Sequence, residues 1–119
     1  MIKQTVSALG VISTAVLIST STLADEKYTR LKADEVNGMR VFNRACAECH
    51  YDGKQGAPRL NDLSDWKRRI FKGEEVLKEH ALNGYLGMPQ KGGRAELTDQ
   101  DVIDAVHYVM VMIRDEPAR

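Results

Sequence analysis

The stretch Cys46-Ala47-Glu48-Cys49-His50 decides how this chain is interpreted. It holds both cysteines of the sequence, separated by two residues, and a histidine follows directly. This CxxCH pattern is typical of covalent haem attachment, in which each thiol adds to a vinyl group of the porphyrin. The spacing places the thiols one helical turn apart, with the histidine beneath the iron. We therefore expect one haem c, attached through Cys46 and Cys49, with His50 as an iron ligand.

Other uses of a cysteine pair fit this sequence less well. A thioredoxin-like dithiol also has the CxxC spacing, but it needs a strand that leads into a helix, and no strand pattern precedes Cys46. A structural zinc site needs four ligands, and a second close Cys or His pair is missing. A disulfide would be ordinary in an exported chain. The histidine that follows the second cysteine favours haem over all three.

The first residues are typical of an export signal, and we expect residues 1–24 to be a signal peptide. Lys3 is followed by no further charge up to Ala24. The apolar centre, residues 6–18, is shorter than the ~20 residues that span a bilayer. Cleavage after Ala24 would leave one domain, residues 25–119, in the periplasm. An uncleaved membrane anchor is the less favoured alternative.

Hydrophobic spacing along the rest of the chain predicts about four helices and no sheet. The expected helices are residues 34–47, residues 65–72 with Ser64 as N-cap, residues 74–83, and a last helix capped by Thr98. Segments 51–63 and 85–96 are rich in glycine and proline and are expected to be loops. The last helix has an apolar stripe expected to be buried: Val102, Ile103, Val106, Val109, Met110 and Ile113. The expected fold is all-α, wrapped around one haem.

The second axial ligand decides whether a haem iron carries electrons or stays open to small molecules. Met88 precedes Pro89 in a glycine-rich loop that can present the sulfur to the haem face opposite His50. The other candidates lie in the signal or on predicted helices: Met1, Met39, Met110, Met112, His80 and His107. Met88 is therefore the expected ligand, and bis-histidine ligation is the alternative.

With these features in place, the chain resembles the class I cytochromes c, and more closely the bacterial cytochrome c5 group. The resemblance covers nearly all of residues 25–119. The matching residues are Gly38, Phe42, Cys46, Cys49, His50, Gly56-Ala57-Pro58, Trp66, Arg69, Gly73, Ala81, Gly84, Met88-Pro89, Gly92-Gly93 and Tyr108.

The resemblance implies roles for residues outside the CxxCH stretch. The carbonyl of Pro58 would accept the ring proton of His50. Trp66 and Arg69 would lie near the haem propionates, with core filling as the alternative for Trp66. Gly38 and Phe42 would cross the last helix near Tyr108.

One segment departs from the group that the chain resembles. Many of its members carry a second cysteine pair between the Met-Pro loop and the last helix, whereas this chain has Gly93-Arg94-Ala95-Glu96 there. The loop that carries Met88 therefore lacks a disulfide.

These features predict a periplasmic electron carrier of the respiratory chain and not an enzyme. It would exchange electrons transiently with a donor and an acceptor protein, as a monomer or weak dimer, with association to membrane respiratory complexes allowed. The 17 basic and 17 acidic residues balance, so no nucleic-acid partner is expected. Four basic residues could steer partners or form an ordinary solvated face: Arg44, Lys54, Lys91 and Arg94. The alternatives are a haem peroxidase, a gas-binding module and a fixed subunit of a membrane complex.

Overall fold

The computed structural model of the protein describes residues 32–115. The expected signal peptide and the first residues of the expected domain lie outside this range. No helix within the described residues is long and apolar enough to cross a membrane.

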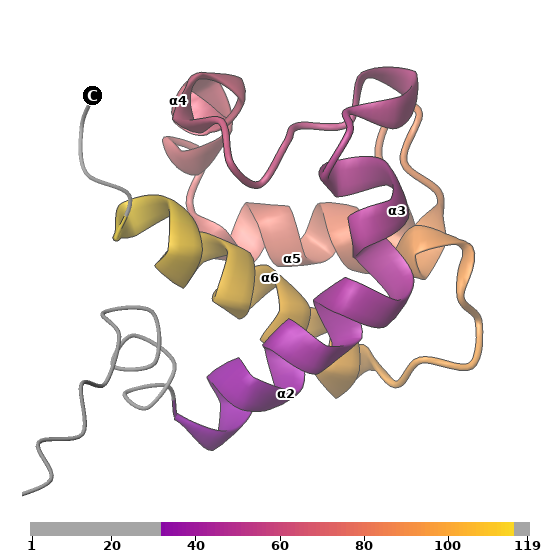
Figure 1. Cartoon of the computed structure of the whole chain (residues 1–119). Helices are drawn as coiled ribbons and strands as arrows, with labels where there is room; N and C mark the ends of the chain where they lie inside the picture. Colours follow the sequence, from indigo (N-terminus) through magenta and orange to yellow (C-terminus); the bar gives the residue numbers. More distant parts are fainter. Residues whose placement is uncertain (1–31, 116–119) are drawn as a thin grey trace, which may run out of the picture.

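The described chain begins with one long helix that bends at a π-helical turn (Figure 1). α2 (Ala33–Val41) continues through the π turn Phe42–Cys46 into α3 (Ala47–His50). The expected helix over 34–47 is therefore confirmed, but the helical segment runs on through the whole CxxCH stretch. A π turn accommodates one additional residue and is frequent at functional sites. Here it joins the segment that packs on the last helix to the segment that carries Cys49 and His50, and Cys46 is its last residue.

Three further helices complete the described fold: α4 (Leu63–Ile70), α5 (Glu74–Asn83) and α6 (Asp99–Arg114). Two 3-10 turns, Lys54–Gly56 and Gln90–Gly93, lie in the loops. α6 packs against both α2 and α5, and α4 lies at the upper left of the view in Figure 1. Residues 32–115 contain no named strand. The expected all-helical fold is confirmed.

The helix ends follow local signals with one exception. The bounds expected for the helix at 74–83 are confirmed, and Thr98 caps α6 by accepting the N–H of Asp101 at 3.1 Å. The cap of α4 was expected at Ser64, and this is wrong. Asp62 is the N-cap, and its carboxylate accepts the N–H of Ser64 at 3.0 Å. Serine and aspartate both favour the N-cap position. Because Asp62 is the cap and not Ser64, α4 begins and ends two residues earlier than predicted.

The crossing of α2 and α6 explains a glycine in the middle of a helix. A Cβ on Gly38 would overlap the backbone carbonyl of Asp104 and come within 2.9 Å of the Tyr108 Cβ. One turn further on, the Phe42 ring lies 5.8 Å from the Tyr108 ring, centroid to centroid. The side chain of Asn37 donates to the buried carboxylate of Asp104 at 2.7 Å. The expected crossing of Gly38 and Phe42 over the last helix near Tyr108 is confirmed.

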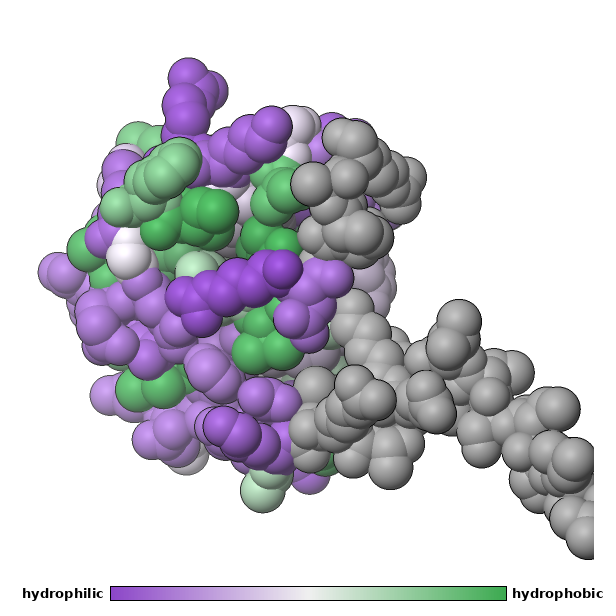
Figure 2. Space-filling view, turned by 90° about the vertical axis from the view of Figure 1, so that its left-hand side faces the viewer, coloured by the Kyte–Doolittle hydropathy of each residue, from purple (hydrophilic) through white to green (hydrophobic). Residues whose placement is uncertain are grey.

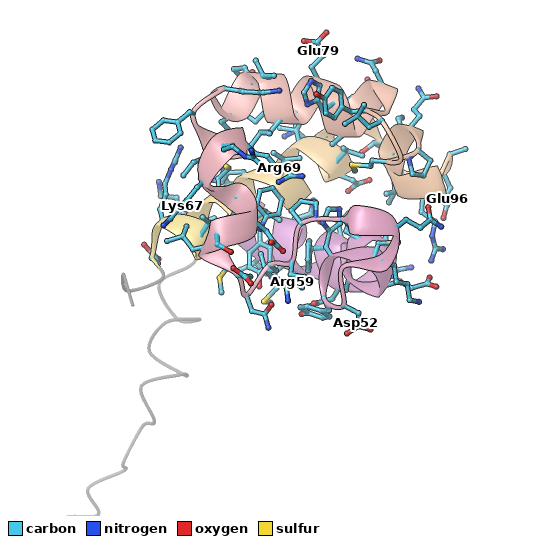
Figure 3. All side chains as sticks on the ribbon, turned by 90° about the horizontal axis from the view of Figure 1, so that it is seen from above. Asp52, Arg59, Lys67, Arg69, Glu79 and Glu96 are labelled. Carbon is cyan, nitrogen blue, oxygen red and sulfur yellow. The ribbon has the colours of Figure 1, made fainter. Side chains whose placement is uncertain are left out.

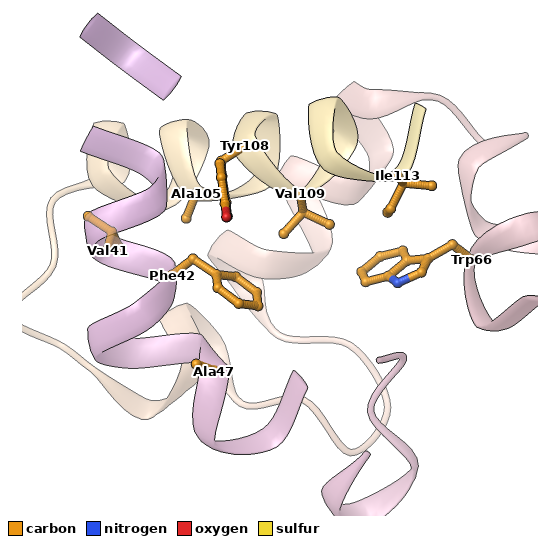
Figure 4. Packing of buried hydrophobic residues seen from close by; sticks show 8 residues of the cluster. All are labelled: Val41, Phe42, Ala47, Trp66, Ala105, Tyr108, Val109 and Ile113. Atoms are coloured by element: carbon orange, nitrogen blue, oxygen red, sulfur yellow. The ribbon is translucent and has the colours of Figure 1, made fainter. Parts of the chain in front are cut away.

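The hydrophobic core lies between α6, the helical segment from α2 to α3, and α4. In Figure 4, Phe42 and Trp66 approach α6 from different elements, beside Val109 and Ile113. The predicted stripe of α6 is buried at Val102, Val109, Met110 and Ile113. Ile103 and Val106, however, are only partly buried, and Ala105 and Tyr108 belong to the core instead. Val106 lines the cavity described below, so its apolar side chain faces the space meant for a cofactor.

Within residues 32–115, two large apolar side chains remain almost fully exposed: Phe71 at 88% and Leu86 at 89%. On the face that Figure 2 shows, apolar side chains gather in separate groups among polar ones. Single exposed apolar residues are common on protein surfaces. Neither residue therefore defines an interface by itself.

Candidate haem site

One cavity brings together every site residue that the sequence predicts. Its lining draws on α2 to α6 and on both loops and is mostly apolar. The predicted residues in the lining are Cys46, Cys49, His50, Pro58, Trp66, Arg69 and Met88. The CxxCH stretch, the Pro58 loop and the Met88 loop are far apart in sequence, yet they enclose one space.

His50 is held in the orientation that metal binding needs. Its Nδ1 atom lies 2.8 Å from the carbonyl oxygen of Pro58, and because a carbonyl only accepts, Nδ1 carries the proton. The Nε2 atom is then free of a proton and can bind a metal. The ring packs against Trp66, with centroids 6.1 Å apart and an angle of 24° between the planes. The contact that the resemblance implied between His50 and Pro58 is present.

Burial also keeps His50 neutral. It lowers the pKa of the imidazole, and the nearby positive charge of Arg69 acts in the same direction, although the hydrogen bond to Pro58 opposes both. A neutral imidazole is the form that binds a metal. The environment therefore favours ligation without competition from a proton.

The two cysteines are free thiols in this structure, Cys46 half-buried and Cys49 exposed. Burial and the neighbouring Cys49 raise the pKa of Cys46 to about 11, although Arg94 acts in the opposite direction. A redox-active dithiol needs a lowered pKa. The environment of Cys46 therefore argues against the thioredoxin-like alternative.

Trp66 and Arg69 form the wall on the α4 side. The indole N–H of Trp66 donates to the carbonyl of Arg59 at 2.8 Å, so Trp66 offers the cavity its ring and not this donor. Arg69 donates to the carbonyl of Asp65 one turn earlier in α4. In Figure 3, Arg69 lies toward the middle of the molecule, whereas Lys67 lies at its edge. Arg69 is therefore the better-placed donor for a haem carboxylate.

Two of the described methionines, Met88 and Met110, line the cavity, whereas Met39 and Met112 are partly buried against the hydrophobic core. Met110 lies on α6 and is 1% exposed. Met88 lies in a tight turn in which its backbone N–H and C=O both pair with Tyr85 at 2.9 Å. The sequence did not identify Met110 as a residue of the cavity, because an apolar stripe does not separate core contacts from cofactor contacts.

The histidine alternatives differ in position. His107 is outside the cavity lining, and its Nδ1 atom lies 2.8 Å from the Glu74 carboxylate. His80 does line the cavity, and its ring stacks on Tyr85 with centroids 3.7 Å apart. Of the two, His80 is therefore the candidate second ligand in the bis-histidine alternative.

Three residues of the lining have a backbone conformation that the sequence did not reveal, although Lys91 was named there as a possible partner contact. Among the described residues, the non-glycine positions with positive φ are Gln55, Leu86 and Lys91, with φ of 55°, 52° and 52°. All three line the cavity. Such conformations cost energy and cluster at functional sites, but side-chain type alone does not reveal them.

The residues present fit a covalently attached haem. Two thiols and an oriented neutral imidazole lie at one wall, a methionine sulfur is available from a separate loop, and the remaining walls are mostly apolar. Cationic Arg69 can compensate a partly buried carboxylate. No group of three or more His, Cys, Asp or Glu side chains suited to a bare metal ion occurs within residues 32–115.

Comparison with known proteins agrees with this fit. A family model described as "Cytochrome C oxidase, cbb3-type, subunit III" matches residues 33–109. Cytochrome c-555 of Chlorobaculum tepidum is 40% identical over 81 residues, which cover 65% of this chain and 75% of that protein. Cytochrome c5 of Ectopseudomonas mendocina is 31% identical over 68 residues, covering 56% and 78%.

A solved structure supports the same assignment. A chain in a crystal structure of an electron transfer complex of nitrite reductase with cytochrome c aligns with a TM-score of 0.61 at 32% identity. The alignment covers 66% of this chain and 95% of that chain. Together with the fold and the cavity, these matches define a haem protein of the cytochrome c type. The chain belongs to the class I c-type cytochromes and is c5-like. It carries covalently attached haem c and serves electron transport.

Proposed function

We propose that this cytochrome is a periplasmic carrier of single electrons whose haem iron is bound by His50 and Met88. The observation that carries the proposal is the pairing of an oriented, neutral His50 and a loop methionine in the lining of one cavity. When bound, the haem supplies an iron that cycles between its ferrous and ferric states. A thioether ligand favours the ferrous state.

The chain's own residues have separate roles in this proposal. Cys46 and Cys49 attach the cofactor, and the Pro58 carbonyl fixes the tautomer of His50. Trp66 excludes water beside the His50 ring, and Arg69 compensates the charge of a haem carboxylate. The mostly apolar lining would limit the access of solvent to the iron and so tune its redox potential.

The charges around the cavity favour a redox partner whose docking surface is acidic. The charged residues of the lining are Lys54, Arg69, Lys72 and Lys91, and within residues 32–115 no Asp or Glu side chain contributes to it. The protein as a whole has balanced charge, so the basic character is local. Complementary charges speed encounter without requiring a tight complex. The structural relative cited above is a cytochrome c in an electron transfer complex, which supports transient docking.

Not all of the basic residues suggested by the sequence are equally available for such steering. Lys91 is only 19% exposed in its side chain and pairs with Asp99 at 2.7 Å. Lys54 pairs with Glu48 at 3.2 Å but remains half exposed. Lys72, which the sequence interpretation did not single out, lies 5.3 Å from the centroid of the Tyr85 ring at the cavity. We assign partner steering to Lys54 and Lys72 and a structural role to Lys91.

A carrier and an open-site haem protein respond differently to carbon monoxide, which tests the proposal. The native ferrous protein is expected to bind carbon monoxide slowly, because Met88 must first leave the iron. The Met88→Ala variant is expected to bind it rapidly. Fast binding by the unmodified protein, or rapid turnover of hydrogen peroxide, would favour a gas-binding module or a peroxidase instead.

A further inference from the structure

The segment that carries Met88 is anchored on both sides by residues outside the proposed ligand set. On the α5 side, Tyr85 and Met88 exchange both backbone hydrogen bonds, each 2.9 Å long, and close a two-residue turn over Leu86 and Gly87. Gly84 allows this turn to lie close, since a Cβ there would come within 3.2 Å of the Met88 carbonyl oxygen. The backbone of Met88 therefore moves with that of Tyr85.

The Tyr85 side chain fixes this turn to α5. Its ring lies face to face on the ring of His80, with centroids 3.7 Å apart and 7° between the planes. The Lys72 ammonium, just after α4, lies 5.3 Å from the Tyr85 ring centroid. Aromatic stacking and a cation near the ring both favour one position of the tyrosine. The stack thus links the Met88 turn to a helix that packs on α6.

Lys91 fixes the other side of the segment to the start of α6. Its ammonium donates to the Leu97 carbonyl at 2.9 Å and pairs with the Asp99 carboxylate at 2.7 Å. The backbone of Lys91 has φ of 52°, a conformation that favours glycine. A lysine is held there although glycine would fit the backbone more easily, because its side chain makes both contacts.

We propose that Tyr85 and Lys91 are positioning residues that clamp the Met88 turn between α5 and α6 and so keep its sulfur on the haem iron. This inference rests on the proposed function, in which Met88 is the ligand. The clamp supplies without a covalent bond the restraint that a disulfide would give this loop. Movement of the turn withdraws the sulfur, so weakening either anchor increases the population of the detached state.

The test uses the haem-loaded protein with one anchor removed at a time. Tyr85→Leu removes the stack, and Lys91→Met removes both polar contacts while keeping most of the side-chain length. Tyr85→Phe is the matched control, because it keeps the ring and loses only the hydroxyl group. The readouts are the rate of carbon monoxide binding to the ferrous protein and the temperature at which the sulfur-to-iron charge-transfer band disappears from the oxidised protein.

We expect Tyr85→Leu and Lys91→Met each to raise the binding rate roughly 2- to 10-fold, the factor that loss of one such contact gives. Their charge-transfer band should disappear at a lower temperature, well before the helices unfold in circular dichroism. Tyr85→Phe should stay within about twofold of the unmodified protein. In the double variant the two factors should multiply, because the anchors act at opposite sides of the turn.

Two results would overturn the clamp, and they have different meanings. Unchanged binding rates and band stability in both variants, or band loss that only follows helix unfolding, would reduce Tyr85 and Lys91 to ordinary fold stabilisers while leaving Met88 as the ligand. Absence of the charge-transfer band from the unmodified protein would overturn the ligand assignment and the clamp together.

Discussion

The Nδ1 atom of His50 and the carbonyl oxygen of Pro58 lie 2.8 Å apart, which fixes the tautomer of the imidazole before any metal binds. The two residues are separated by the loop that follows the CxxCH stretch, and the N–H of Leu60 returns to the carbonyl of His50 at 2.8 Å. The loop is therefore tied to His50 through both its side chain and its backbone. The polypeptide itself therefore orients His50 for binding to the haem iron.

The close approach of α2 and α6 predicts a severe effect of the smallest substitution. In Gly38→Ala the added methyl group would overlap the Asp104 carbonyl, a backbone atom that cannot move alone. We expect the free energy of unfolding to fall by about 1–3 kcal/mol, as in other overpacked sites. Denaturant unfolding measures this loss. Val36→Ala, at an exposed position of the same helix, is the control and should change stability by less than about 0.5 kcal/mol. Equal effects would contradict the close crossing.

The cap of α4 predicts different outcomes at two neighbouring residues. Asp62→Ala removes the acceptor for the Ser64 N–H and should lower the free energy of unfolding by about 1 kcal/mol. Asp62→Asn keeps an acceptor and should cost only a few tenths of that. Ser64→Ala should cost less than Asp62→Ala, because it removes the hydroxyl that donates to Asp62 but leaves the bond from the Ser64 N–H to the cap. A larger loss in Ser64→Ala than in Asp62→Ala, measured by thermal or denaturant unfolding, would return the cap to Ser64.

The environment of Glu74 predicts that the stability of the fold decreases in acid. Partial burial alone would raise its pKa, but the hydrogen bonds from His107 and Lys78 outweigh burial, and the pKa lies below its usual value of 4.5. The folded state thus holds this proton less tightly than the unfolded state, so the stability from Glu74 is present above pH 4.5 and is lost as pH falls through the folded pKa.

The matched variant for this effect is Glu74→Gln. It should lower stability by about 1 kcal/mol at neutral pH, since the amide oxygen can still accept a hydrogen bond but lacks the negative charge that strengthens the contacts with His107 and Lys78. Below pH 4.5 the difference from the unmodified protein should shrink. Chemical unfolding over a series of pH values measures both. A difference that stays constant down to pH 3 would show that Glu74 does not carry the effect.

How far the sequence predicts this fold depends on where each signal lies. α5 and the start of α6 were predicted correctly, because Asn83-Gly84 and the Thr98 cap are local signals that neighbouring packing does not override. Ser64 and Asp62 are both capping types, and only the extended backbone of Asp62, with φ of −127°, decides between them. The π turn Phe42–Cys46 has no local signature. It lies in a helical segment that contributes residues both to the hydrophobic core and to the lining of the cavity.

The sequence names more residues of the candidate site than of its surroundings. CxxCH and Met-Pro are compact motifs, so Cys46, Cys49, His50 and Met88 could be named, and the cavity brings them together. The stack of Tyr85 on His80 could not be foreseen, because the sequence shows that the helix ends at Asn83-Gly84 but not which side chain Tyr85 then packs on. Nor does apolar periodicity tell a residue that faces protein from one that faces a cofactor, as Val106 demonstrates.

The basic lining of the cavity predicts salt-dependent electron transfer. With an acidic redox protein as partner, the rate should fall as ionic strength rises, because added salt screens the attraction. Lys72→Gln should slow the reaction at low salt by up to roughly fivefold and flatten the salt dependence. Lys67→Gln is the control, since Lys67 is exposed on α4 but lies outside the cavity lining. Stopped-flow kinetics measures both, and equal effects would point to net charge alone.

The assignment of Met88 as the second ligand is the central claim, and Met110 provides the sharpest comparison because both line the cavity. The decisive measurement is the absorption spectrum of the oxidised haem protein, unmodified and as Met88→Ala and Met110→Leu. The account predicts a sulfur-to-iron charge-transfer band in the unmodified protein and in Met110→Leu, and its loss in Met88→Ala. A band that survives in Met88→Ala, or that disappears in a folded Met110→Leu variant, would contradict it.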